Sequence, residues 1–304
     1  QIDAEHLLQH ADLAMYKAKQ SGRNTFRLFT EDMEQTVRQR FKLEVALPDA
    51  ITKNQFFLHY QPKANCHSNE IIGFEALLRW QHPEYGLIPP GEFIPIIDED
   101  NLVIEIGEWV LNEVCRQLAE WRQQGLAVLP VAVNISGHHL HSPSLLPCVK
   151  QTLNAHAIGS ELIEIEITEG VLTSHTEYSI AVMSALKTLG IKLSVDDFGT
   201  GYSSLSYLKN FPIDILKIDQ TFVRDAASNI EDGAICKAII SLAKSLDLQI
   251  IAEGVETQEQ LTFLKQHDCH SYQGYLFSRP LPADKIPRVL SHSDDKAGSM
   301  ANLA

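Results

Sequence analysis

The chain has 304 residues, 44% of them hydrophobic and 21% charged, which suits one globular domain of about 250 residues plus a further segment. Its formal net charge of −14 argues against binding to a nucleic-acid polymer, because that binding depends on a basic surface. No apolar stretch reaches the ~20 residues needed to cross a bilayer, so we expect no membrane contact by this segment.

The five cysteines show no CxxC spacing, and an odd number in a chain of this length argues against a disulfide framework. We therefore expect a reducing, cytoplasmic location. The chain opens with Gln1 rather than Met, which indicates a fragment of a longer protein. The rest of that protein could still carry a membrane anchor or a sensor.

Short apolar runs alternate with amphipathic stretches from about residue 30 onward. The runs that we expect to be strands cover residues 56–60, 71–78, 128–135, 162–168, 191–195, 213–218, 248–252 and 272–277. Helices are expected over residues 93–124, with a break near 98–101, and over 145–155, 178–189, 203–208, 233–246 and 258–265. The strands are nearly continuous apolar runs, as is typical of parallel strands buried on both faces. This pattern predicts an α/β fold, a (β/α)8 barrel of the TIM type.

A doubly wound open sheet is the alternative fold. It would place a glycine-rich phosphate-binding turn after the first strand, whereas this chain has Tyr60-Gln61-Pro62-Lys63 there. In a barrel, the active site lies at the carboxyl ends of the strands, so those ends are where chemistry is expected.

Two adjacent carboxylates, Asp196 and Asp197, end the apolar run 191–195 and are followed by the loop 198–204. At the end of a strand both can converge on one site, where one of them would keep its proton unless a cation lay between them. Hard carboxylate oxygens suit Mg²⁺ or Mn²⁺. A solvated Asp-Asp turn is the alternative.

A polar or charged side chain accompanies the end of every predicted strand. These residues are Gln61, then Glu75 with Arg79, Asn134, Glu166 with Glu169, Asp196 with Asp197, Lys217 with Asp219, Glu253 with Glu256, and Gln273. Any single one could be a satisfied edge residue or a helix N-cap. Together they would crowd carboxylates into one barrel mouth, and bound cations would offset the repulsion. Two hard metal ions ~3.5–4 Å apart are a recurring device for attack on phosphate esters.

Lys217 lies inside the apolar run 215–218, where an unpaired ammonium would be costly. Facing the acidic site, it could orient a metal-bound water or stabilise charge on a phosphate. The alternative is a lysine on the outside of the barrel whose ammonium reaches solvent.

The segment Glu75-Ala76-Leu77-Leu78-Arg79 resembles the signature of EAL-type cyclic di-GMP phosphodiesterases. The resemblance spans roughly residues 36–290 and includes segments 60–62, 133–136, 166–169, 196–205, 217–219, 252–257 and 273–275. A lone Glu-Ala-Leu would carry no weight, but this ordered set at these spacings is highly specific.

The resemblance implies a barrel that holds two Mg²⁺ or Mn²⁺ ions. One ion would be bound by Glu75, Asn134, Glu166 and Asp196, and the second would share Asp196 and add Asp197 and Glu253. A water bridging the ions would be the nucleophile and Lys217 would contact a metal-bound water, which makes the implied catalytic set Glu75, Lys217, Glu253, Asp196 and Asp197. Glu169 would tether the loop 198–205. The dinucleotide would be held by Gln61, Leu77, Arg79, Asp219, Glu256 and Gln273, with Arg79 on phosphate.

The same resemblance implies opening of one phosphodiester to give linear 5′-pGpG, and a homodimer coupled through the loop near the fifth strand. Residues 1–29 resemble the closing helix and strand of a GGDEF diguanylate cyclase domain whose nucleotide signature is absent, so no cyclase activity is expected. Residues 30–50 would form a linker helix with a kink or an end at Pro48. The barrel would cover 51–290, and 291–304 would be a disordered tail.

Two other functions stay open. The first is a non-catalytic cyclic di-GMP receptor, and the second is an unrelated metal-assisted barrel enzyme such as an aldolase. The presence of every implied metal ligand and of the complete loop 198–205 favours catalysis. An aldolase would need a Schiff-base lysine at an isolated apolar strand end, and it would leave the ring of carboxylates unexplained.

Overall fold

The computed structural model describes residues 4–20, 24–99, 102–173, 176–200 and 208–293. The chain forms two compact units. The smaller unit comprises residues 1–56 and 80–102, and the larger unit comprises residues 57–79 and 103–304. Among the described residues, no helix combines the length and the apolar character needed to span a membrane.

The smaller unit contains α1 (Ala4–Gln20), α2 (Glu31–Thr52), β3 (Gly86–Ile88) and α3 (Pro90–Glu99). The helix expected over residues 30–50 is present as α2. It continues through Pro48 to Thr52, so of the two outcomes expected at this proline, a kink or an end, the structure excludes the end. Leu47 and Ala50, on either side of the proline, are buried. The backbone N–H of Lys53 donates a helical hydrogen bond to the carbonyl of Asp49 at 2.9 Å, so the helix continues past the proline. Packing on both sides therefore offsets the one hydrogen bond that the proline removes.

The larger unit contains a closed barrel of eight strands, as predicted. The strands are β1 (Phe56–Asn65), β2 (Ile71–His82), β4 (Val131–Asn134), β5 (Ile163–Thr168), β6 (Lys192–Phe198), β7 (Ile215–Ile218), β8 (Gln249–Ala252) and β9 (Ser271–Tyr272). They pair in the order β1-β9-β8-β7-β6-β5-β4-β2, and β1 also pairs with β2, which closes the cylinder. A short strand, β10 (Leu281–Pro282), adds to β1.

The first strand of the barrel runs antiparallel to its neighbour β9, with Ala64 opposite Tyr272, whereas β2 and β4 to β9 are mutually parallel. Only residues 66–70 connect β1 to β2, which is enough for a hairpin but too short for the crossover that parallel strands require. Because β1 continues to Asn65, Gln61 lies in the interior of this strand. The expectation that it follows the carboxyl end of the first strand is wrong.

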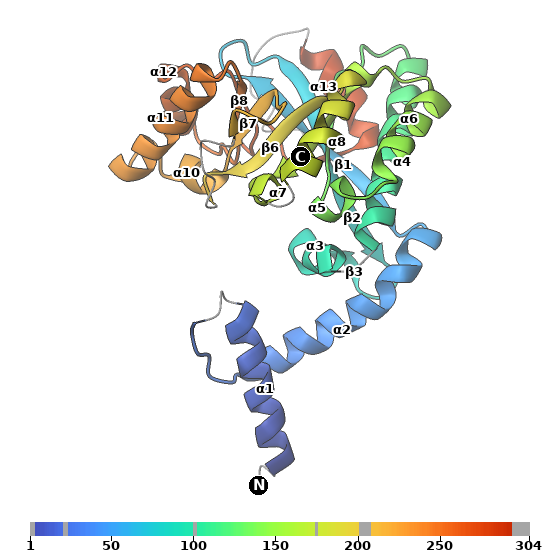
Figure 1. The fold of residues 1–304 in the computed structure, drawn as a ribbon, viewed down its shortest axis with the longest axis vertical. Helices are drawn as coiled ribbons and strands as arrows, with labels where there is room; N and C mark the ends of the chain where they lie inside the picture. The colour runs from blue at the N-terminus through green and yellow to red at the C-terminus, as the bar shows by residue number, and fades with distance from the viewer. Residues whose placement is uncertain (1–3, 21–23, 100–101, 174–175, 201–207, 294–304) are drawn as a thin grey trace. The chain divides into compact units, whose positions relative to one another are not determined.

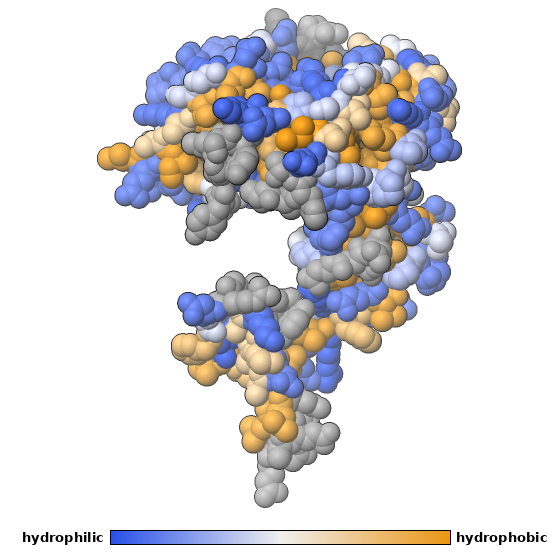
Figure 2. Space-filling model, viewed as in Figure 1, coloured by the Kyte–Doolittle hydropathy of each residue, from blue (hydrophilic) through white to orange (hydrophobic). Residues whose placement is uncertain are grey.

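Helices surround the strands of the larger unit (Figure 1). They are α4 (Leu102–Gln123), α5 (Gly137–Leu140), α6 (Leu145–His156), α7 (Glu169–Thr173), α8 (Thr176–Thr188), α10 (Gln220–Arg224), α11 (Ile230–Ser245), α12 (Gln258–Gln266) and α13 (Ile286–Ser293), with single 3-10 turns at Ser160–Leu162 and Ala283–Lys285. The predicted helix 93–124 is present as α3 and α4. Hydrophilic residues cover much of the visible face of this unit, with hydrophobic residues between them (Figure 2).

Two expectations near the end of the chain need correction. The strand expected over 272–277 ends at Tyr272, because at Gly274 the chain packs against the backbone of Val255 and turns, with Phe277 bonded back to Gly274. Residues 291–293 of the expected disordered tail belong to α13. The remainder of that tail, and nearly all of the helix expected over 203–208, lie outside the described residues.

The strand interiors confirm burial on both faces. All four residues of β7 are buried, and so are five of the six residues of β5. Most of these side chains are aliphatic, but charged residues interrupt the apolar pattern: Glu164 and Glu166 on β5 and Lys217 on β7. Because buried charges are costly unless paired, these positions direct attention to the barrel interior and its mouth.

Candidate active site

Carboxylates on β2, β5 and β6, and that of Glu253 directly after β8, meet at one end of the barrel. Carboxylate oxygens of Glu75, Glu166 and Asp196 lie within 4.8 Å of one another. A second group with the same spacing is formed by Asp196, Asp197 and Glu253. Asp196 belongs to both groups, so the fold assembles two overlapping sets of three carboxylates. The alternative of a solvated Asp-Asp turn does not describe Asp196, which lies in a strand among the other acids.

Asn134 ends β4 beside the first of these groups. Its side-chain amide donates a hydrogen bond to Oε1 of Glu75 at 2.8 Å. The structure therefore brings together the six residues that the sequence singled out as candidate metal ligands.

Lys217 of β7 lies at the centre of the carboxylates and its side chain has no exposed area. Its ammonium nitrogen is 2.5 Å from Glu253, 2.7 Å from Glu166, 3.1 Å from Asp196 and 3.6 Å from Glu75. The alternative of a lysine on the barrel exterior is therefore wrong. One ammonium is shared among four carboxylates.

A second buried ammonium, which the sequence reasoning missed, belongs to Lys63 of β1. Its nitrogen lies 2.7 Å from Oε1 of Glu166 and 2.9 Å from Oε1 of Glu164. Although burial alone would raise the pKa of Glu166, the ammonium groups of Lys217 and Lys63 lower it to about 2. The sequence offers little signal for this lysine, because Lys63 lies beyond the expected strand 56–60, after Gln61 and Pro62, and not within an apolar run as Lys217 does.

Three other acids of the cluster, Glu75, Glu253 and Asp197, hold their protons more tightly than usual. Burial raises the pKa of Glu75, and the charge of Glu166 adds to that effect. Burial likewise raises the pKa of Glu253 to about 8; the ammonium of Lys217, which is shared among several carboxylates, offsets only part of this effect. Burial also raises the pKa of Asp197 to about 6, and the negative charge of Asp196 adds to that effect. The cluster is thus short of positive charge. Its all-oxygen donors and this deficit fit Mg²⁺ or Mn²⁺.

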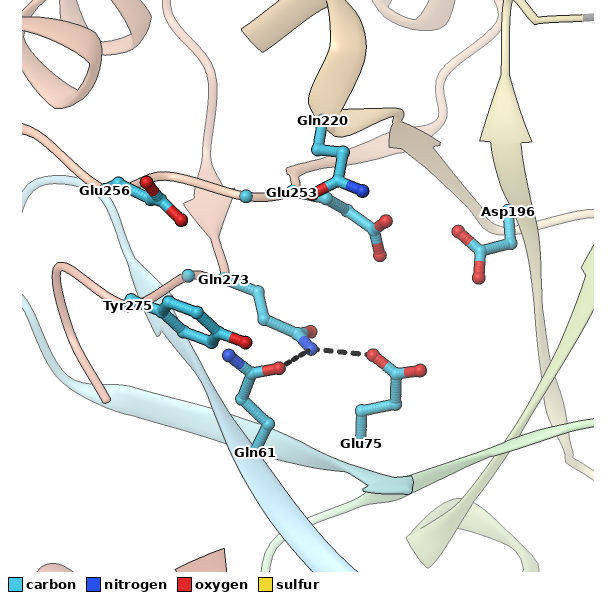
Figure 3. Close-up of a pocket in the computed structure, with 10 residues that line it drawn as sticks. Gln61, Glu75, Asp196, Gln220, Glu253, Glu256, Gln273 and Tyr275 are labelled. Atoms are coloured by element: carbon cyan, nitrogen blue, oxygen red, sulfur yellow. Dashed lines mark hydrogen bonds between the residues drawn. The ribbon is translucent and has the colours of Figure 1, made fainter. Parts of the chain in front are cut away.

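A cavity adjoins the carboxylates (Figure 3). It is lined by Gln61, Glu75, Asp196, Gln220, Glu253, Gly254, Glu256, Gln273, Gly274 and Tyr275. Gln273 connects the two sides, since its amide donates to Gln61 at 3.0 Å and to Glu75 at 2.6 Å. The carboxylates of Glu253 and Asp196 point toward a shared space.

The cavity includes only part of the expected substrate-binding set. Gln61, Glu256 and Gln273 line it, whereas Leu77, Arg79 and Asp219 do not. Asp219 instead caps α10 by accepting from the backbone of Thr221 at 2.9 Å. Arg79 is half-buried and donates to the carbonyl of Leu78 at 2.8 Å.

Besides the glycines Gly254 and Gly274, two lining residues were missed from the sequence, Gln220 and Tyr275. Both lie close to predicted site residues, Asp219 and Gln273, but neither is at the end of an apolar run, which was the pattern used to select candidate site residues. The guanidinium of Arg279 lies over the ring of Tyr275, 4.2 Å from its centroid. The cavity therefore combines amides, carboxylates and one aromatic ring.

Glu169, the first residue of α7, contacts the segment that follows β6. Its Oε2 accepts from the backbone N–H of Gly199 at 2.8 Å, and Glu169 is buried. Gly199 has φ +102, a conformation that favours glycine. The contact links α7 to the segment directly after the two aspartates. Residues 201–205 of the expected loop lie outside the described residues.

A family model described as EAL domain matches residues 44–280, most of the chain. The chain belongs to the EAL domain family. Among curated relatives it is 41% identical over 280 residues to the bifunctional diguanylate cyclase/cyclic di-GMP phosphodiesterase MucR of Pseudomonas aeruginosa, covering 92% of this chain and 41% of the relative. It is 42% identical over 286 residues to the cyclic di-GMP phosphodiesterase PdeR of Escherichia coli, covering 94% of this chain and 43% of the relative.

This EAL domain also resembles solved structures. A MucR phosphodiesterase in complex with c-di-GMP superposes with a TM-score of 0.77 at 42% identity, covering 81% of this chain and 99% of that one. The chain spans about two fifths of the length of the curated relatives MucR and PdeR. Named cyclic di-GMP phosphodiesterases are therefore among its relatives, and the part they share with it includes the barrel.

Proposed function

We propose that this chain is a metal-dependent phosphodiesterase that hydrolyses cyclic di-GMP to linear 5′-pGpG. The observation that carries the proposal is the pair of three-carboxylate groups that share Asp196 beside a polar cavity. Relatives named as cyclic di-GMP phosphodiesterases, and a relative solved with c-di-GMP, support the choice of substrate.

In this proposal one ion is held by Glu75, Asn134, Glu166 and Asp196, and a second by Asp196, Asp197 and Glu253. When bound, such a pair activates a water molecule and offsets negative charge on the phosphodiester. The protein's own contribution is to keep the carboxylates at one end of the barrel. The ammonium of Lys217 adds positive charge where the phosphate would react, because its nitrogen lies within 3.1 Å of both Asp196 and Glu253.

Substrate contacts would come from the cavity wall. Gln61 and Gln273 present amides next to Glu75, and these amides can bind the nucleotide while the phosphodiester faces the carboxylates. Glu256 lies at the same wall. Leu77, Arg79 and Asp219, which do not line the cavity, would contact the dinucleotide only where it extends beyond it.

The direct test is incubation of the protein with cyclic di-GMP, with Mg²⁺ or with EDTA, followed by separation of the products. We expect pGpG only when the metal is present. Binding of cyclic di-GMP without turnover would favour a non-catalytic receptor, and no binding at all would favour a different barrel enzyme. Glu75→Ala should abolish turnover with no change in the circular dichroism spectrum. Near-normal turnover by this variant would contradict the ligand assignment.

We further propose that residues 1–29 are the end of a GGDEF domain, that α2 links it to an EAL barrel at 51–290, and that the protein forms a homodimer. The relative MucR carries the name of a bifunctional cyclase and phosphodiesterase, which supports the first part. Sedimentation equilibrium would test the last part, since a monomer at all concentrations would contradict it.

A further inference from the structure

Glu166 differs from the other carboxylates of the site in the way its two oxygens are used. Oε1 accepts from Lys63 at 2.7 Å, and Oε2 accepts from Lys217 at 2.7 Å. The Glu166 side chain has no exposed area. Lysines from two different strands, β1 and β7, therefore each hold one oxygen of this carboxylate.

The two lysines have different surroundings. Lys217 also contacts Asp196 and Glu253, so Oε2 of Glu166 faces the carboxylates of the barrel mouth. Lys63 also pairs with Glu164, which lies two residues before Glu166 on β5 and thus on the same face of the strand. Neither Lys63 nor Glu164 lines the cavity, and both are nearly without exposed area. The Lys63–Glu164 pair thus lies beneath the site, away from the substrate.

A buried ion pair of this kind is not explained by stability. An apolar pair of similar volume is often equally stable, because both charges lose their hydration on burial. What an apolar pair would not supply is a donor to Oε1 of Glu166. Lys63 makes that contact, and Glu164 holds Lys63 in position by accepting from the same ammonium.

We propose that Lys63 is a positioning residue that holds Oε1 of Glu166 away from the barrel mouth, so that only Oε2, which also accepts from Lys217, faces a metal ion. The inference rests on the proposed metal site. It also has a consequence for the choice of ion. Mg²⁺ and Mn²⁺ suit six-coordinate sites with one oxygen from each carboxylate, whereas Ca²⁺ takes 6–8 oxygens and often both oxygens of a carboxylate. Lys63 would thereby favour the smaller ions over Ca²⁺.

The test removes the ion pair without changing the net charge of the barrel interior. In the double variant Lys63→Met/Glu164→Leu, Oε1 of Glu166 loses its donor while one positive and one negative charge disappear together. Binding of Mn²⁺ and of Ca²⁺ is measured by isothermal titration calorimetry without substrate. We expect Mn²⁺ affinity to fall by about 10–100-fold, the usual effect of removing a group that orients a ligand. Ca²⁺ affinity should fall less, so the preference for Mn²⁺ shrinks.

The matched control is Glu164→Gln, whose amide oxygen still accepts from Lys63 and leaves the contact to Glu166 in place. It should bind both ions much as the wild type does. If the folded double variant also binds both ions as the wild type does, Lys63 merely balances Glu164 and the proposal is wrong. Equal weakening for the two ions would equally overturn it, because a general distortion of the site would not discriminate between them.

If the proposed metal site itself is wrong, the wild type will bind neither Mn²⁺ nor Ca²⁺, and this result is distinct from a failure of the proposal for Lys63. Should leucine at position 164 prevent folding, Lys63→Met/Glu164→Met is judged by the same criteria, since unbranched methionine adapts to irregular gaps. Thermal unfolding followed by circular dichroism establishes beforehand which variants are folded.

Discussion

The ammonium nitrogen of Lys217 lies 2.5 Å from Oε1 of Glu253, inside a barrel where the lysine side chain has no exposed area. The same nitrogen lies 2.7 Å from Glu166 and 3.1 Å from Asp196, so one cation holds acids from three other strand ends together. Loss of this cation should therefore affect both the stability of the metal-free protein and the chemistry of the site.

We expect Lys217→Met, which is nearly isosteric, to lower the rate of pGpG formation by on the order of 10²–10³-fold, the usual effect of removing one preorganised charge partner. In EDTA its unfolding free energy should fall by about 3–5 kcal/mol, because buried carboxylates lose their counter-charge. Turnover assays and urea unfolding measure the two effects. Lys192→Met, at an exposed position on β6, is the control and should change neither. Normal turnover by Lys217→Met would contradict the proposed role.

The contact between Glu169 and Gly199 predicts a second effect on turnover. Glu169→Ala removes the acceptor of the Gly199 N–H and should lower pGpG formation by about 10²-fold, since misplacement of groups near a reacting centre by about 1 Å has effects of that size. Glu169→Gln retains an oxygen acceptor and should keep more of the activity. Equal activities of the two variants would show that the hydrogen bond does not matter.

The raised pKa of Glu253, about 8, predicts how the stability of the metal-free protein depends on pH. Between the ordinary glutamate value of about 4.3 and about 8, the folded state binds more protons than the unfolded state, so stability falls as the pH rises. Mg²⁺ competes with the proton, and its stabilising effect should therefore grow over the same range.

Thermal unfolding from pH 5 to pH 9, in EDTA and in Mg²⁺, measures both trends. Glu253→Gln cannot titrate, so its melting temperature in EDTA should depend less on pH than that of the wild type. An equally steep dependence in this variant would assign the effect to another group, of which Asp197, with a pKa of about 6, is the first candidate.

Gly274 predicts a steric effect next to the cavity. A Cβ at this position would lie 2.1 Å from the carbonyl oxygen and 2.3 Å from the nitrogen of Val255, and these backbone atoms have little freedom to move. Gly274→Ala should displace Gln273 from Glu75, lower affinity for cyclic di-GMP and reduce the melting temperature. Gly170→Ala on α7 is the control, because a Cβ there meets no atom within 4 Å. If the two variants had the same affinity for cyclic di-GMP and the same melting temperature, the contact between position 274 and the Val255 backbone would not limit the size of this residue.

Much of the fold could be predicted because apolar runs report burial directly. Each of the eight expected strands has a counterpart in the barrel, although the last one stops at Tyr272. The grouping of Glu75, Glu166 and Asp196 could also be predicted, because the carboxyl ends of parallel strands converge at one end of a barrel. An acid at the end of an apolar run is therefore informative from the amino-acid order alone.

Other features depend on which residues meet across the barrel, and a one-dimensional pattern does not contain that information. Periodicity indicates that β1 is buried but not that it runs antiparallel, and this direction places Lys63 beneath Glu166. Gln220, the first residue of α10, and Tyr275, in the turn after β9, reach the cavity because of how these segments pack. The sequence by itself determined the barrel and the ring of acids at its mouth, because local burial and strand order are sufficient for both. Only the tertiary structure decided the ion pairs and the cavity wall, because these depend on contacts between residues far apart in the chain.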